Sequence, residues 1–205
     1  MNPLNTIKGT IIAGVVLAVV IGLLDTALID VPVAFNSRSF ILWIHVLAGV
    51  AWIGLLYYFN FVQVPALAEA ASDQGGPGGA AISKYVVPRA LLWFRWAAVV
   101  TWLSGATYLL HEGMFDDAFL LGLTPGTVDN AFWIGIGAWL GTIMLFNVWV
   151  LIWPNQKKVL GLVEATAEQI TKARRVAFLA SRTNTLLSIP MLMSMVGYGH
   201  AGFII

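Results

Sequence analysis

Histidines are the residues of this sequence best suited to hold a cofactor, and there are three: His45, His111 and His200. The chain contains no cysteine, which excludes disulfides, thiolate catalysis, iron–sulfur clusters and cysteine-ligated zinc. No nucleophile–base pair, P-loop, dinucleotide fingerprint or HExxH motif is present, which argues against a hydrolase or a kinase. Any redox or metal chemistry therefore depends on the histidines.

His45 lies in the string HVLAGVAWIG. Residues three, four and seven positions apart share one face of a helix, so Ala48, Gly49 and Trp52 lie on the same face as His45. An imidazole, two small residues and an indole form a surface for a flat macrocycle, and haem iron takes histidine as a ligand. We therefore predict that His45 is the metal ligand of a haem b, with Trp52, His111 and His200 beside the cofactor. The alternative is that His45 makes an interhelical hydrogen bond at a close helix contact.

Arg95, in LLWFRW, is the most costly side chain to place in a membrane. It could bind a propionate, a quinone carbonyl or an anionic substrate, and we include it among the cofactor-binding candidates. The alternative is that it extends to the cytoplasmic interface or stacks between Trp93 and Trp96. Three asparagines on other segments, Asn60, Asn147 and Asn184, form an inner polar layer of interhelical hydrogen bonds. We expect Arg95 to hydrogen-bond one of them, a carbonyl or a bound anion.

The elements that position these residues are membrane helices. Hydrophobic residues make up 59% of the chain and charged residues 10%, against roughly 25% charged in soluble domains, and the mean hydropathy is +0.84. A span needs about 20 apolar residues, and five stretches qualify: 10–29, 40–64, 89–111, 130–153 and 182–200. We expect Pro65 and Pro154 to end the second and fourth helices and Pro190 to kink the fifth. We identify no internal repeat.

The predicted fold class is an all-α integral membrane protein, a bundle of about five transmembrane helices. Residues 1–39 form an N-terminal anchor helix with a short external loop, and residues 40–205 form a four-helix membrane bundle. The Lys and Arg residues concentrate in the segment 155–182 and near Lys8 and Lys84, which predicts a cytoplasmic N-terminus and a periplasmic C-terminus in the bacterial inner membrane. The formal net charge of +1 gives no reason to expect nucleic acid as a partner.

This topology also predicts depths. At 1.5 Å per residue, His45 lies about 10 Å outward of the centre of its helix, and His111 and His200 lie at the outer ends of theirs. Arg95 and the three asparagines lie about 7–12 Å inward of their helix centres. The histidines therefore share the outer half of the bundle and the arginine–asparagine layer shares the inner half.

The strings HVLAGVAWIG, YYFNFVQVP, PRALLWFRW, FNVWVLIWPNQKK and SRTNTLLSIPML resemble the N-terminal membrane domain of the bacterial cytochrome-c-linked urate oxidase family. The resemblance covers roughly residues 40–200, in the same order. It implies an inner-membrane protein that passes electrons from a substrate toward the respiratory chain. The matching positions are His45, Trp52, Asn60, Arg95, Asn147, Trp153, Asn155, Gln156, Arg182, Asn184 and His200. In that family a cytochrome c domain follows the membrane part, whereas this chain has no CxxCH motif and resembles a stand-alone membrane domain.

Two functions follow from the sequence. In the first, the chain is a membrane redox module that binds haem b and relays electrons to a periplasmic cytochrome c. It would then be a membrane oxidoreductase or a subunit of one. In the second, it is a non-catalytic accessory or assembly subunit of a larger energy-transducing membrane complex. The outer histidines favour the first function, and the missing cytochrome domain favours the second.

Overall fold

The computed structural model describes residues 2–28, 34–126 and 131–200. The chain divides into two units, one ending at Ser37 and the other beginning at Arg38. The first unit holds a short 3₁₀ turn, η1 (Pro3–Asn5), and the helix α1 (Ile7–Leu28). The helix α1 is apolar on all sides and long enough to cross a membrane, as the sequence predicts. The predicted bounds at Ile29 and Asn130, and the C-terminus at Ile205, lie outside the described residues.

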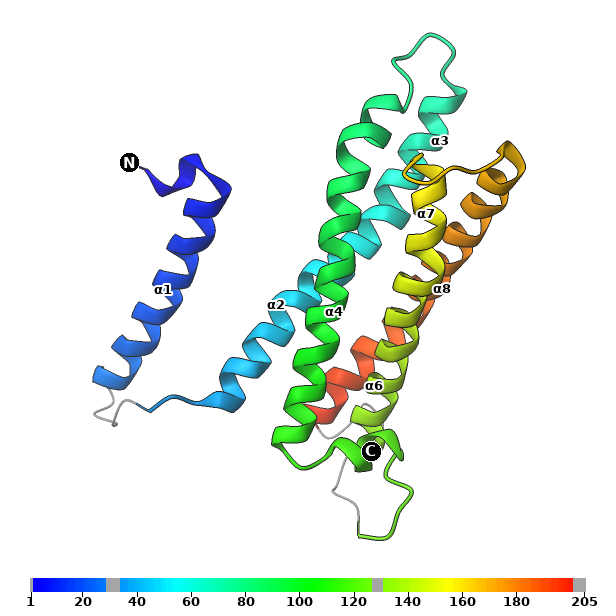
Figure 1. Cartoon of the computed structure of the whole chain (residues 1–205). Coiled ribbons are helices and arrows are strands. Elements are labelled where there is room, and N and C mark those ends of the chain that lie inside the picture. The colour runs from blue at the N-terminus through cyan, green and yellow to red at the C-terminus, as the bar shows by residue number, and fades with distance from the viewer. Residues whose placement is uncertain (1, 29–33, 127–130, 201–205) are drawn as a thin grey trace. The chain divides into compact units, whose positions relative to one another are not determined.

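The second unit contains the other helices (Figure 1). A first rod consists of α2 (Ser37–Tyr57), the π-helical turn η2 (Tyr58–Gln63) and α3 (Val64–Ser72). After a loop, the π-helical turn η3 (Ile82–Val86) leads into α4 (Val87–His111), and the short α5 (Phe115–Phe119) follows. The chain then forms α6 (Ala131–Phe146), the π-helical turn η4 (Asn147–Ile152), α7 (Trp153–Val159) and the long α8 (Ala167–Gly199). Every regular element in the described residues is therefore helical, which confirms the fold class.

Prolines do not end the helices where the sequence analysis expects them to. The first rod continues through Pro65 to Ser72, and the rod that begins with α6 continues through Pro154 to Val159. In each case, and again at Pro88, a π-helical turn comes first and the proline is the second residue of the next α-helix. Proline needs no backbone donor at that position, and the wider π turn relieves the clash with the preceding turn. The predicted ends at Pro65 and Pro154 are therefore wrong.

Four stretches of the described residues are long and apolar enough to cross a membrane: Ile7–Leu24, Ser37–Ser72, Ile82–His111 and Ala131–Val159. The fifth predicted span lies within α8, which does not reach the same mean hydropathy. Its composition explains the difference, because α8 places Asn184, Ser188 and Ser194 inside the bundle, where each is buried completely. The polar first half of α8, which opens with a Thr166 capping box, includes part of the basic segment.

The core of the second unit lies where α2, α4, α6 and α8 come together (Figure 1). Trp52, Leu56, Phe94 and Met144 are its largest fully buried side chains. Phe59 meets Phe94 edge to face, with ring centroids 5.5 Å apart. Large apolar side chains also cover the outside of the bundle, among them Trp93 and Leu186, which are 59% and 66% exposed. A surface of this kind fits hydrocarbon rather than water.

Candidate functional site

A cavity of about 800 Å³ lies among α2, α4, α6 and α8. We call it the histidine cavity, because His45 and His200 both line it. Its walls are mostly apolar and include six glycines on four helices: Gly49, Gly54, Gly105, Gly137, Gly141 and Gly199. A largely apolar cavity of several hundred Å³ with a few polar groups is typical of a small-molecule or cofactor site.

His45 is held in one orientation by its neighbours on α4. Its Nδ1 lies 2.8 Å from the carbonyl oxygen of Thr101. Because a carbonyl can only accept, Nδ1 carries the proton and Nε2 of the neutral ring keeps its lone pair. The ring lies directly over Gly105, where an added Cβ would come within 2.9 Å of the imidazole Cε1. The structure therefore fixes the tautomer that a metal-binding Nε2 requires.

His200 is the C-cap residue of α8 and also contacts a backbone carbonyl, but one of its own helix and at an exposed position. Its Nδ1 lies 2.9 Å from the carbonyl oxygen of Val196, so this ring also donates from Nδ1 and leaves Nε2 uncommitted. The hydrogen bond between Tyr57 and Ser188, at 3.0 Å, joins α2 to α8. His45 precedes Tyr57 by 12 residues and His200 follows Ser188 by 12 residues. Because the two helices run in opposite directions, both histidines lie about 18 Å along the bundle from that hydrogen bond, on the same side of it.

The other two cofactor candidates lie elsewhere. His111 is not part of the cavity wall, and its Nδ1 contacts the Glu112 carboxylate at 3.1 Å. Arg95 does not line the cavity either: its guanidinium carbon lies 3.5 Å from the centre of the Trp153 ring. The buried Nε of Arg95 has no hydrogen-bond partner in the described part of the chain. No hydrogen bond joins Arg95 to an asparagine in the described residues, so that part of the expectation is wrong, whereas a bound anion stays a prediction. The stacking partner is Trp153 rather than Trp93 or Trp96.

The inner asparagines instead hydrogen-bond α8 and its neighbours. Asn147 donates to the Asn184 side-chain oxygen at 2.8 Å, and Asn184 donates to the Met144 carbonyl at 3.0 Å. Asn60 donates to Ser181 at 2.8 Å and to the carbonyl of Leu56 at 2.9 Å. All of these bonds except the one from Asn60 to Leu56 join two helices, and none of the asparagines lines the histidine cavity, so the structure places them among packing contacts.

Trp52 lies on the cavity wall together with His45 and Gly49, along the helix face that the sequence spacing predicts. The side chain is 1% exposed and packs in the core. It therefore forms part of the apolar support of the cavity. No group of three or more His, Cys, Asp or Glu side chains suited to a bare metal ion occurs in the described ranges, whereas an iron held in a macrocycle needs only one or two protein ligands.

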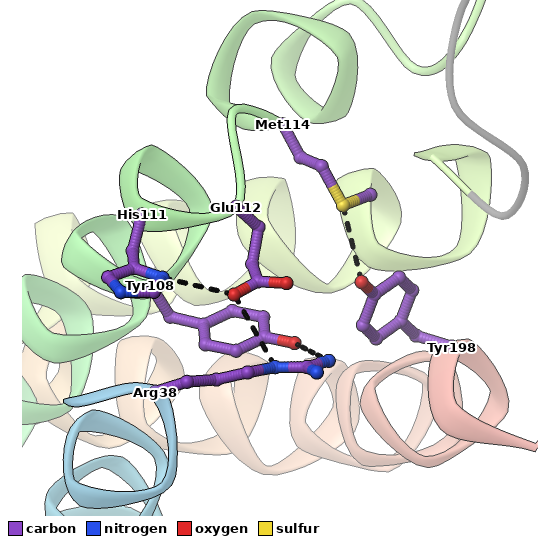
Figure 2. Close-up of polar contacts among 6 residues, drawn as sticks. All are labelled: Arg38, Tyr108, His111, Glu112, Met114 and Tyr198. Carbon is purple, nitrogen blue, oxygen red and sulfur yellow. Dashed lines mark hydrogen bonds and ion pairs between the residues drawn. The ribbon is translucent and has the colours of Figure 1, made fainter. Parts of the chain in front are cut away.

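Sequence reasoning missed a polar cluster at the edge of the cavity, which we call the mouth cluster: Arg38, Tyr108, His111 and Glu112 (Figure 2). Arg38 donates from Nη2 to the Tyr108 hydroxyl at 3.2 Å and lies 3.4 Å from Glu112 through Nε. Arg38 and Tyr108 both line the histidine cavity. The signal was present, because Arg38, His45 and Trp52 are seven residues apart and share a helix face.

Comparison with known proteins gives one match. The family model described as "Urate oxidase N-terminal" matches residues 34–121 and 121–204. No curated protein and no solved structure matches.

The two matched segments are of similar length, and the pattern Trp-x-Gly-x₄-Phe-Asn occurs once in each, beginning at Trp52 and at Trp139. Its last residue, Asn60 or Asn147, lies in a π-helical turn both times, so the chain does contain a short internal repeat.

Proposed function

We propose, from the premise that this chain belongs to the urate oxidase N-terminal family, that it is a membrane redox module that binds haem b in the histidine cavity. His45 and His200 would be the axial ligands. Bound haem b supplies one-electron redox chemistry between ferric and ferrous iron. The role of the protein is to hold the macrocycle, to exclude water and to set the distance to a partner cytochrome.

One observation carries this proposal. Two imidazoles from antiparallel helices line one cavity at the same level, and each uses Nδ1–H on a backbone carbonyl while Nε2 stays free. Metal-binding histidines almost always donate their second ring N–H to such an acceptor, which fixes the ring and raises the basicity of the ligand nitrogen. Helical bundles commonly hold cofactors between facing helices in this way.

The walls of the cavity suit a large apolar ring. Gly105 lies against the His45 ring and Gly137 lies against Ser194 and Met195, where an added Cβ would come within 3 Å of a side-chain atom, so these two glycines allow close packing around the cavity. Met191, Met195 and Leu192 from α8 add flexible apolar contacts. These apolar side chains lower the local dielectric inside the cavity, which tunes a redox potential.

The location of the cavity supports an electron relay toward the periplasm. Lys157 and Lys158 end α7 and Arg174 and Arg175 lie on α8, all at the end of the bundle away from the histidines. Under the positive-inside rule this end is cytoplasmic, and the histidine cavity lies near the periplasmic surface of the inner membrane, where a soluble cytochrome c could approach. Reporter fusions test this orientation: a fusion at residue 76 should report the cytoplasm and one at residue 117 the periplasm. The opposite pair of signals would contradict it.

The test of haem binding uses the full chain in nanodiscs, titrated with haem and followed by its Soret band. Wild-type protein should bind one haem, and His45→Ala and His200→Ala should each weaken binding at least tenfold. His111→Ala is the control for ligation, because His111 is not part of the cavity wall, and it should keep the Soret band of histidine-ligated haem. A protein that remains colourless would overturn the proposal and favour the accessory-subunit function.

A further inference from the structure

The mouth cluster contains a cation directly beside the histidine cavity. Arg38 is the one Lys or Arg side chain along the cavity wall in the described residues. Its side chain is 54% exposed, so it stands where the cavity opens rather than in the core. Its guanidinium lies over the Tyr108 ring, with Cζ 5.8 Å from the ring centre, which limits the positions that it can take.

The guanidinium has unused hydrogen-bonding capacity. Arginine carries five N–H donors in a planar fork, and two contacts account for only part of them: Nη2 to Tyr108 and Nε to Glu112. The Glu112 carboxylate at 3.4 Å shows that the fork accepts a carboxylate at this position. Figure 2 shows both contacts on one edge of the Arg38 side chain. Arginine is the residue best matched to bidentate carboxylate binding.

We infer that Arg38, positioned by Tyr108, is the binding site for a carboxylate carried by the ligand of the histidine cavity. The ligand class is a flat amphiphile with an apolar body and an acidic edge. This inference rests on the proposed function for its choice of ligand, because the acidic edge of haem b is its pair of propionates. The apolar body lies between the histidine helices and the acidic edge meets Arg38 at the opening.

Glu112 has the opposite role in this arrangement. Its carboxylate shares the guanidinium with the incoming acid and repels it, because like charges at short range disfavour one another. The inference therefore predicts that neutralising Arg38 and neutralising Glu112 change the affinity for an acidic ligand in opposite directions. Removing the charge of Arg38 weakens binding of an acidic ligand, and removing the charge of Glu112 strengthens it, while neither change affects a ligand without carboxylates.

The experiment compares four ligands on the full chain in nanodiscs: haem b, its dimethyl ester, metal-free protoporphyrin IX and the dimethyl ester of that porphyrin. Binding is followed by the Soret band for the iron compounds and by porphyrin fluorescence for the others. Wild-type protein should prefer each diacid over its ester by about tenfold or more. Arg38→Gln should remove that preference, Glu112→Gln should increase it, and Arg89→Gln, outside the cavity, should leave it unchanged.

The outcomes separate this inference from the proposed function. Equal affinity of wild-type protein for diacid and ester overturns the role of Arg38, even if the Soret band shows haem bound through histidine. A diacid preference for the metal-free porphyrin with no haem coordination supports Arg38 and overturns the haem ligation. A preference that Arg38→Gln retains, in a variant with unchanged thermal unfolding, also overturns the inference.

Discussion

Gly105 provides a sharp test of how the structure holds His45. In Gly105→Ala the new Cβ would lie 2.9 Å from Cε1 and 3.1 Å from Nδ1 of His45, closer than carbon and nitrogen atoms pack. Gly105 is on α4, so the backbone cannot easily retreat, and the imidazole is the part that moves. The movement breaks the 2.8 Å hydrogen bond to Thr101.

The magnitude follows from the role of that hydrogen bond. Loss of the partner of a metal-binding histidine typically weakens metal affinity by about 10- to 100-fold. Alanine in place of glycine within a helix favours folding by about 1 kcal/mol, so the variant should remain folded. We therefore expect Gly105→Ala to weaken haem binding at least tenfold while thermal unfolding moves little or upward.

The assay is a Soret titration in nanodiscs together with a thermal unfolding curve. Gly14→Ala is the matched control, because Gly14 is also helical but does not line the histidine cavity, and an added Cβ there meets no atom within 4 Å. It should bind haem as the wild type does. Wild-type affinity in Gly105→Ala would refute the reasoning, because the imidazole would not need its observed position.

Three further predictions concern the inner half of the bundle. Asn184→Ala removes a fully buried side chain that bonds Asn147 and a backbone carbonyl, and should lower the free energy of unfolding by about 1–3 kcal/mol, measured by denaturant titration in detergent. Arg95→Gln should change stability by less than about 1 kcal/mol, because a lost cation–π contact of about 0.5–2 kcal/mol is offset by removal of the unpartnered Nε, and the Soret band should not change. Trp153→Leu should destabilise more than Arg95→Gln, since it leaves the cation without its closest aromatic partner.

The helices could be predicted because length and hydropathy are local properties of the sequence. Their ends were harder to predict. Pro65 and Pro154 predict helix ends by the usual rule, but a π-helical turn before each proline keeps the rod continuous. A single inserted residue in a turn leaves no clear signal in composition, so the sequence does not reveal it.

The candidate site could be predicted only in part, for a related reason. Distance along a helix gives depth, which placed His45 and His200 in one half of the bundle. Depth does not give the direction of a side chain at a helix end, so His111 could not be told apart from them. Arg95 contacts Trp153 on α7, and spacing within α4 alone cannot predict which residue of another helix a side chain contacts.

The coordination state of bound ferric haem tests the central claim most directly. Electron paramagnetic resonance of the full chain loaded with haem should show a low-spin signal with two axial imidazoles. His45→Ala and His200→Ala should each convert it to a high-spin signal that added imidazole reverses, while His111→Ala keeps the low-spin signal. A low-spin signal that survives in either cavity variant would contradict the assignment of that histidine, and a wild-type protein that binds no haem would contradict the account as a whole.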